Sequence, residues 1–193
     1  HMFDIGQWAM GKDGSGPVEV IPKGYNGQEY MTLKYANGVE MSEAPYVEEV
    51  PDAKGVRIFG SEGWVEVGRG YLGCSNKKLV PKEIAGFRPE NLTPEQRRKR
   101  YEEMQKMQEK GGGSFEISSP HMQNFIDSMK TRQDPVAPIE VGASTSIACS
   151  LANMATELGR PVKWNPATQR YVNDKEAEGH RLNHYEYRSP YKL

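Results

Sequence analysis

Cysteine, net charge and long apolar runs are all scarce in this sequence, and each scarcity excludes a class of protein. The two cysteines, Cys74 and Cys149, are too few to build a disulfide framework. A net charge of −1 gives no electrostatic basis for binding nucleic acid or an anionic membrane. No apolar run approaches the roughly 20 residues that a membrane-spanning helix needs. We therefore expect a soluble protein, cytoplasmic or exported to the periplasm, with neither nucleic acid nor membrane as a partner.

The clearest helical signals in the sequence lie between residues 118 and 164. A first helix is expected to begin at Ser119 and Pro120, because serine is a good N-cap and proline tolerates the first helical position. Its apolar residues share one helical face: Met122, Phe125, Ile126 and Met129. A second helix is expected to end at Gly159, and its apolar stripe consists of Ile147, Leu151, Met154, Ala155 and Leu158. Cys149 lies beside that stripe, so we expect its thiol to be buried.

Short segments of alternating apolar residues, separated by turn residues, predict antiparallel strands. They lie at residues 18–20, 30–35, 39–41, 55–59 and 64–67. Asn37-Gly38 is the strongest hairpin signal, because both residues accept the positive φ angles of a tight turn. The two helical stripes need a common surface to cover. We therefore predict an α/β fold of the α+β type, with an open, mainly antiparallel mixed sheet and helices packed on one face.

One glycine motif invites comparison with a dinucleotide-binding loop. Residues 68–73 (GRGYLG) match the spacing G-x-G-x-x-G and follow a predicted strand. A dinucleotide loop must open a helix whose N-terminal N–H groups hold the pyrophosphate. Pro81 interrupts the segment that follows, and this segment has no helical apolar stripe. We therefore interpret the motif as a glycine-rich exit from the edge of a sheet.

Several segments of the sequence carry a family resemblance. The run FIDSMKTRQDPVAPIEVG and the helix that ends LGRPVKWNP resemble the C-terminal domain of the Gfo/Idh/MocA oxidoreductases, which include glucose–fructose oxidoreductase and inositol dehydrogenase. The opening HMFDIGQWAMG and the ending VNDKEAEGHRLNHYEYRSPYKL are similar to the sugar-dehydrogenase-like branch of that family. The resemblance implies that residues 1–193 form a single C-terminal domain for substrate binding and oligomerisation, with a charged helical insertion at about residues 73–113. The family's N-terminal Rossmann domain would then lie outside this chain.

The resemblance also implies a function. It leads us to expect an NAD(P)-dependent oxidoreductase acting on a sugar or polyol, in which this domain forms the substrate pocket and a subunit interface. A sheet with helices on one face leaves its other face exposed, so we expect a homo-oligomer to assemble through that sheet face. NAD or NADP would be bound mainly by the Rossmann domain, and this chain is expected to hold no cofactor by itself. Two alternatives stay open. One is a catalytically silent binding or scaffold module, and the other is a relative that uses bound NAD to cleave glycosides by oxidation, elimination and re-reduction.

The candidate site residues lie in the first expected helix of the chain. The resemblance aligns His1 with a family histidine that serves in proton transfer at the sugar carbon that loses hydride. Imidazole suits this role because it exchanges a proton near neutral pH. The alternative is that His1 is the remnant of a cleaved tag. Asp4 and Trp8, one and two turns further along, are the candidate substrate-binding residues. His180 and His184 have helical spacing but no third ligand, so no metal site is expected.

Overall fold

A computed structural model describes residues 1–44, 55–68, 71–79, 119–184 and 187–191 of the chain. The chain divides into two compact units, which are treated separately below: unit 1 comprises His1–Pro51 and Ile139–Leu193, and unit 2 comprises Asp52–Pro138. Most of the charged insertion that the sequence predicts at about residues 73–113 lies outside the described residues. The assignment of the whole chain to one substrate-binding and oligomerisation domain stays a prediction.

Unit 1 is built on a five-stranded sheet in which every neighbouring pair is antiparallel. The strand order is β3 (Glu40–Ser42), β2 (Thr32–Lys34), β1 (Glu19–Ile21), β7 (Val162–Asn165) and β8 (Arg170–Tyr171). The predicted Asn37-Gly38 turn connects β2 to β3, and Gly38 has a φ of +82°. Such a φ is open to glycine at no steric cost, which is why the local sequence already specifies this hairpin.

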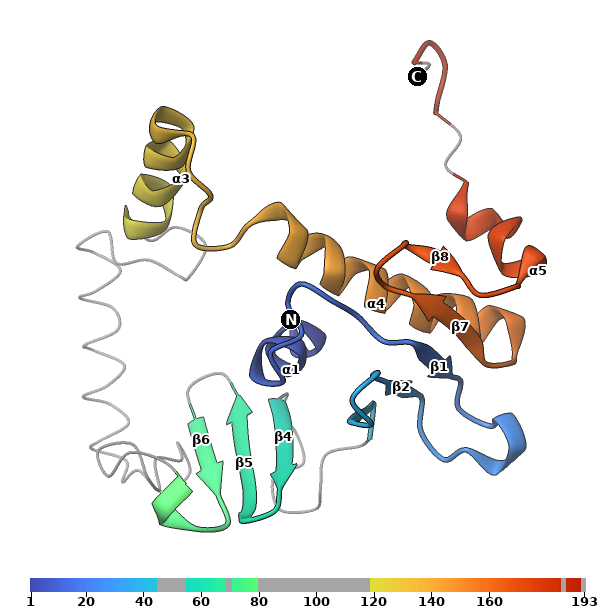
Figure 1. The fold of residues 1–193 in the computed structure, drawn as a ribbon, viewed down its shortest axis with the longest axis horizontal. Coiled ribbons are helices and arrows are strands. Elements are labelled where there is room, and N and C mark those ends of the chain that lie inside the picture. The colour runs from blue at the N-terminus through green and yellow to red at the C-terminus, as the bar shows by residue number, and fades with distance from the viewer. Residues whose placement is uncertain (45–54, 69–70, 80–118, 185–186, 192–193) are drawn as a thin grey trace, which may run out of the picture. The chain divides into compact units, whose positions relative to one another are not determined.

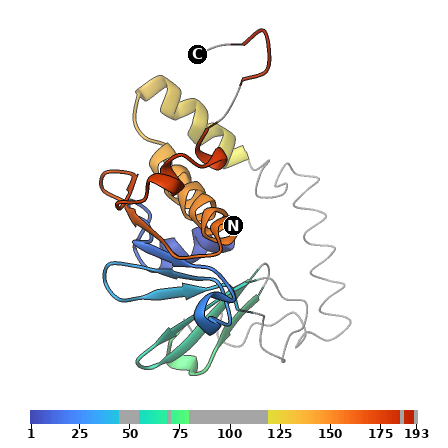
Figure 2. The ribbon, with the colours of Figure 1, turned by 90° about the vertical axis from the view of Figure 1, so that its right-hand side faces the viewer.

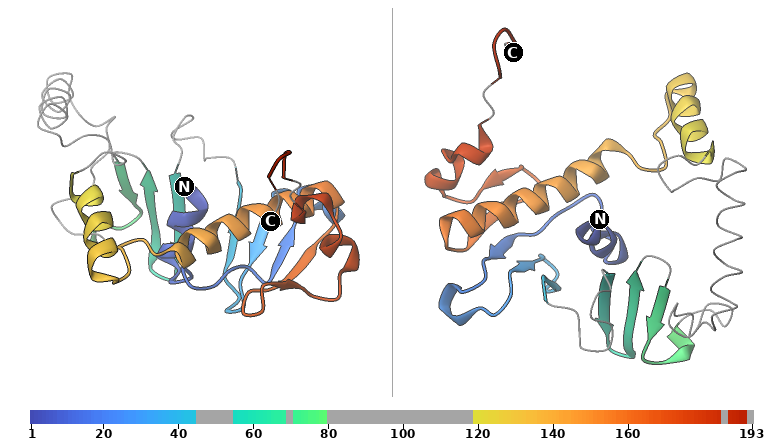
Figure 3. Two further views of the ribbon diagram at one scale, coloured as in Figure 1. Left: turned by 90° about the horizontal axis from the view of Figure 1, so that it is seen from above. Right: turned by 180° about the vertical axis from the view of Figure 1, so that it is seen from behind.

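The long helix α4 (Ile139–Leu158) packs against β1 and β7 of this sheet (Figures 1 and 3). The core of unit 1 consists of buried apolar residues from both layers: Val20, Leu33, Tyr35, Ala148, Leu151, Ala152, Met154, Ala155, Val162 and Ala177. The helix ends as predicted, because Gly159 adopts the left-handed conformation with a φ of +65°. The prediction for Cys149 is wrong, since its side chain is exposed. One residue corresponds to about 100° around a helix, so Cys149 falls outside the buried stripe that contains Ala148.

Two shorter elements complete the helical layer of unit 1. The N-terminal helix α1 (Met2–Ala9) packs against α4, and Figure 2 shows the blue α1 beside the orange α4. Near the C-terminus, the Asp174 carboxylate caps α5 (Lys175–Glu178) by accepting a hydrogen bond from the Ala177 N–H. Asp174 also accepts two hydrogen bonds from the Arg160 guanidinium, at 2.7 and 2.8 Å. These bonds, chiefly those from Arg160, hold the pKa of Asp174 below its ordinary value. The 3-10 helices η1 (Tyr25–Gly27) and η4 (Arg181–Asn183) lie in the connecting segments.

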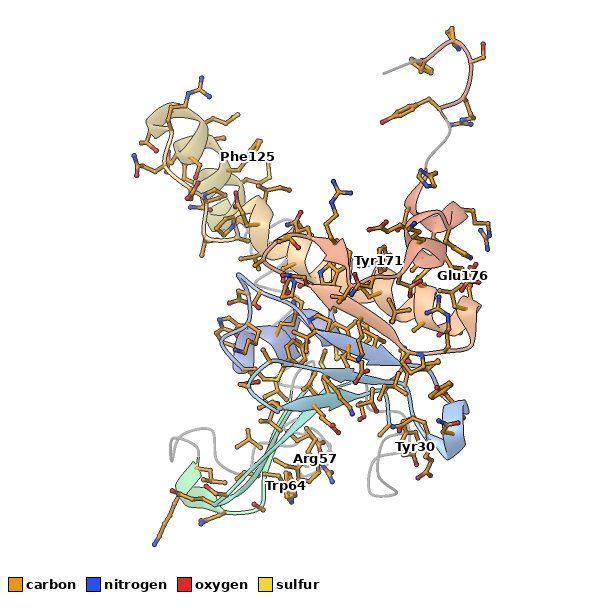
Figure 4. The ribbon with its side chains drawn as sticks, turned by 45° about the vertical axis from the view of Figure 1, so that its right-hand side comes forward. Tyr30, Arg57, Trp64, Phe125, Tyr171 and Glu176 are labelled. Atoms are coloured by element: carbon orange, nitrogen blue, oxygen red, sulfur yellow. The ribbon has the colours of Figure 1, made fainter. Side chains whose placement is uncertain are left out.

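Unit 2 contains a separate three-stranded antiparallel sheet. It consists of β4 (Gly55–Gly60), β5 (Gly63–Gly68) and β6 (Tyr71–Cys74), and it is followed by the 3-10 helix η2 (Lys77–Leu79). On one face Arg57 donates to Glu66 from Nε at 2.7 Å, and its guanidinium lies 4.4 Å from the centroid of the Trp64 ring (Figure 4). Glu66 is fully buried, and its Oε1 atom has no hydrogen-bond partner among the described residues. These contacts join β4 to β5 by an ion pair and a cation–π interaction.

The glycine motif at residues 68–73 belongs to this small sheet. Gly68 ends β5 and pairs with Tyr71 of β6, and Gly73 pairs with Glu66. The motif therefore joins two antiparallel strands, and no α-helix begins at its third glycine. This agrees with the structural interpretation of the motif, because the helix N-terminus that would hold a pyrophosphate is missing there.

The predicted helix α3 (Ser119–Thr131) is present, but it falls in unit 2. The sequence predicts that both amphipathic helices cover one sheet; α4 covers the five-stranded sheet, whereas Met122, Phe125 and Met129 of α3 are about half exposed. The α/β class with open antiparallel β-structure is confirmed, and the described strands form two sheets where one was expected. No helix among the described residues combines the length and apolar character needed to cross a membrane.

Candidate functional site

The three candidate residues predicted from the sequence lie on α1, and the structure places them in different surroundings. His1 is the N-cap of the helix, and its exposed side chain makes no capping hydrogen bond. Asp4 is partly buried, and its Oδ1 atom accepts a hydrogen bond of 3.0 Å from the Thr145 hydroxyl of α4. Trp8 is 71% exposed. Asp4 thus has a structural contact within unit 1, while His1 and Trp8 present their side chains to solvent in the isolated chain.

A residue that the sequence analysis did not select, Gln7, is the centre of the contact between α1 and α4. Its side chain is fully buried. The amide nitrogen donates to the Ser144 hydroxyl at 3.2 Å and to the Thr145 hydroxyl at 3.4 Å. The amide oxygen accepts from the Tyr35 hydroxyl at 3.2 Å. The polar atoms of a buried glutamine must find partners inside the protein, so this network fixes how α1 sits on α4 and on the end of β2.

Tyr35 contributes to the network in a single protonation state. The residue is 3% exposed, and burial raises the pKa of its phenol well above the ordinary value of 10.0. The phenol therefore keeps its proton through the neutral range and remains the donor to the Gln7 oxygen. Because Tyr35 follows β2 and packs in the core, the network connects α1 to the sheet as well as to α4.

The network ends at the wall of a cavity in unit 1. The Ser144 hydroxyl, which accepts from Gln7, itself donates to the backbone carbonyl of Ser15. Ser144 and Ser15 both line a cavity of about 240 Å³ that also touches the start of α4 and the turn between β7 and β8. None of His1, Asp4 and Trp8 is among its lining residues. The structure therefore does not join the predicted site residues to this cavity.

A signal for the network was present in the sequence. Phe3, Gln7 and Met10 recur at i, i+4 and i+7, and both Phe3 and Met10 pack against the core. A glutamine on such a stripe indicates a buried amide that needs partners. The identity of those partners could not be read, because Ser144 and Thr145 lie 137 and 138 residues away along the chain.

The described residues offer limited support for a cofactor or a metal. Among them, no three His, Cys, Asp or Glu side chains are close enough together to hold a metal ion. His180 lies 3.6 Å from Glu157, on the side of unit 1 where Arg181 also pairs with Glu157. These contacts join the C-terminal segment to α4.

Comparison with protein-family models, with curated proteins and with solved structures finds no match for the chain. The site consists of a helix with an exposed histidine at its start, a buried polar network that orients this helix, and a small cavity at the far end of the network. Such an arrangement orients the backbone that carries an accessible imidazole and can bind a small ligand, and it contains no nucleotide-binding loop in the described residues.

Proposed function

We propose that this chain is the substrate-binding half of an NAD(P)-dependent oxidoreductase that acts on a sugar or polyol. The nicotinamide would be bound mainly by a separate nucleotide-binding domain, and this chain would supply one wall of the active site. His1 would exchange the proton at the carbon that loses or gains hydride, and Asp4 and Trp8 would contact the substrate. The proposal includes a homo-oligomer that assembles through the face of the five-stranded sheet.

The buried attachment of α1 is the observation that supports this proposal best. An acid or base must be held within hydrogen-bonding reach of the atom it serves. The Gln7 network gives α1 a defined orientation through contacts with Tyr35, Ser144 and Thr145. His1 precedes the first turn of that helix, and the Ile5 N–H donates to its carbonyl at 3.0 Å. Packing thus orients the backbone that carries the imidazole, while the imidazole itself stays accessible.

The proposal predicts that a longer protein with a Rossmann domain binds nicotinamide and that this chain alone does not. The 193-residue chain alone should give no saturable NADH or NADPH signal in a fluorescence titration, because the described residues contain no helix that opens on a glycine-rich loop. A longer protein in which a Rossmann domain precedes this chain should bind one of the two cofactors and oxidise or reduce a polyol. If the longer protein bound neither cofactor, the oxidoreductase proposal would be wrong and the scaffold alternative would be favoured.

Net reduction of NAD during turnover separates the glycosidase alternative from the dehydrogenase. A glycosidase of this kind regenerates its bound NAD in every cycle, so it produces no net NADH. Incubation with a glycoside would then release a free sugar without any change in nicotinamide absorbance. A dehydrogenase would instead reduce one NAD for every substrate molecule oxidised.

The proposed assembly surface carries a row of alternating charge. Side chains of adjacent strand residues point to opposite faces of a sheet, so the face opposite the buried Val20 and Leu33 carries the intervening positions. Four of these positions are in register across β3, β2, β1 and β7: Glu40, Lys34, Glu19 and Lys163. If two copies pack face to face about a two-fold axis parallel to the strands, the row of charges in the second copy runs in the opposite direction. Each glutamate would then face a lysine, which makes the row complementary to itself.

Charge reversal tests this assembly. A variant with Lys34→Glu and Lys163→Glu, and a second with Glu19→Lys and Glu40→Lys, should each be monomeric, because every facing pair becomes a like-charge pair. An equimolar mixture of the two variants should form heterodimers, since the opposite charges again face each other. Sedimentation velocity measures all three states. A wild-type chain that stays monomeric at tens of micromolar, or a mixture that does not associate, would contradict the proposed surface.

A further inference from the structure

The cavity at the start of α4 has three walls, each held in place by its own contacts. One wall is the loop at residues 14–16, which the Ser144 hydroxyl holds to α4 through the Ser15 carbonyl. The second is α4 itself, with Ile139, Glu140, Ala143, Ser144 and Ile147. The third is the turn between β7 and β8, where the Asn165 side chain accepts hydrogen bonds from the backbone N–H groups of Ala167 and Thr168. The cavity is therefore preformed, which lowers the entropy cost of filling it.

The aromatic part of the cavity is also fixed. Trp164 of β7 lines it, and the ring of Tyr171 on β8 packs edge-on against the indole at a centroid distance of 5.0 Å (Figure 4 labels Tyr171). Edge-to-face packing restricts the orientation of the indole. Ala143, Ile147 and Pro166 add further apolar surface around it. The cavity thus combines a rigid aromatic residue with a largely apolar lining.

Polar groups without partners complete the lining. Glu140 and Gln169 both line the cavity and are exposed, and among the described residues neither side chain makes a hydrogen bond or an ion pair. Ser144 is different, because its hydroxyl already accepts from Gln7 and donates to Ser15. The side-chain groups that remain for a ligand include the Glu140 carboxylate, the Gln169 amide and the Ser15 hydroxyl. Together they supply acceptors for hydroxyl groups and a donor for a hydroxyl oxygen.

We propose that this cavity binds a single sugar or polyol, with Trp164 against the apolar face of the ligand and with Glu140 and Gln169 bonded to its hydroxyl groups. The volume of about 240 Å³ is below the roughly 300–1,000 Å³ typical of pockets for drug-sized ligands, which suits a small ligand. Glu140 lies in the first turn of α4 and offsets the partial positive charge of the helix start, so an anion gains little there. A cation would be repelled by the partial positive charge at the start of α4, and a single carboxylate would have to offset that repulsion. A neutral polyhydroxylated ligand fits best.

The test uses the complete 193-residue chain without any nicotinamide. The chain has three tryptophans, Trp8, Trp64 and Trp164, so a nitrogen-15 spectrum has one indole signal for each. Titration with myo-inositol and with D-glucose should shift the Trp164 signal saturably for at least one of them, with half-saturation below ~10 mM. The signal of Trp64, which belongs to unit 2, should stay in place. Choline serves as the cationic comparison ligand.

Two variants test whether the shift of the Trp164 signal comes from binding in the cavity. Glu140→Gln and Gln169→Ala should each weaken binding by about tenfold or more, because each removes a hydrogen bond to a ligand hydroxyl. The matched control Glu178→Gln changes an exposed glutamate of α5 outside the cavity and should leave binding unchanged. A Trp164 signal that does not move at ~100 mM polyol would overturn the proposal. So would tighter binding of choline than of either polyol, or unchanged binding in both cavity variants.

This inference rests on the proposed function only for the choice of ligand class, and the two can fail separately. Polyol binding at Trp164 without nicotinamide binding in the longer protein would uphold the cavity and remove the oxidoreductase. Nicotinamide binding and polyol turnover by the longer protein, together with a Trp164 signal that does not respond to polyol, would uphold the oxidoreductase and remove the cavity.

Discussion

Replacement of His1 by alanine, in a longer protein that carries the nucleotide-binding domain, is expected to lower turnover by roughly 10²–10⁴-fold. This is the usual contribution of a positioned acid or base, and the resemblance of the N-terminal helix assigns that role to the imidazole. Substrate affinity should change much less, because the lost interaction is made mainly in the transition state. Steady-state kinetics with the preferred polyol measures both quantities.

Two further measurements identify the cause of this loss. Added imidazole should restore part of the activity of the His1→Ala variant, because a small base can enter the space that the side chain leaves. The control His121→Ala changes an exposed histidine of α3 and should retain normal turnover. Normal turnover in the His1→Ala variant would remove the role given to His1 and would fit a cloning remnant. The oxidoreductase proposal would then still stand on nicotinamide binding.

Replacement of Gln7 by alanine is expected to lower the free energy of unfolding by roughly 2–4 kcal/mol. The change leaves a cavity beneath α1 and removes the acceptor of the buried Tyr35 hydroxyl, which lies 3.2 Å from the Gln7 oxygen. It also removes the donor to Ser144 and Thr145. Urea denaturation followed by circular dichroism gives the difference in stability.

A matched control and a double variant make this test specific to the network. Gln123→Ala changes an exposed glutamine of α3 and should alter stability by less than ~0.5 kcal/mol. The combination of Gln7→Met with Tyr35→Phe should cost less than the sum of the single changes, because neither variant group then needs a polar partner. Strictly additive costs would show that the two side chains are not coupled.

The pH dependence of stability provides an independent check on Tyr35. Its pKa is raised by burial in the folded chain, while in the unfolded chain the phenol ionises near the ordinary value of 10.0. The stability that Tyr35 contributes is therefore fully present below pH 10.0 and is lost as the pH rises through the folded pKa. Tyr35→Phe should remove this part of the alkaline loss of stability, measured by urea denaturation between neutral and alkaline pH.

Several features of the fold were predictable because they depend on a few neighbouring residues. Asn37-Gly38 specifies the β2–β3 turn through the positive φ that Gly38 adopts, and Gly159 ends α4 for the same reason. The cap of α5 is equally local, because the Asp174 side chain accepts from the N–H of Ala177, three residues further along. The second helix could be predicted because its apolar stripe repeats at the period of a helix. Each of these signals requires no knowledge of distant parts of the chain.

The sequence by itself thus determined the β2–β3 turn, the C-terminal end of α4 and the antiparallel α/β class, whereas the tertiary structure decided which surfaces meet. Cys149 shows the difference, because the way α4 packs on the sheet decides where the buried stripe ends, and the thiol lies just outside it. The division of the strands into two sheets is another such decision. Gln7 is the strongest case, since its partners are 28, 137 and 138 residues away. A buried polar group is satisfied by whatever the folded chain brings next to it, and local sequence carries no record of that neighbour.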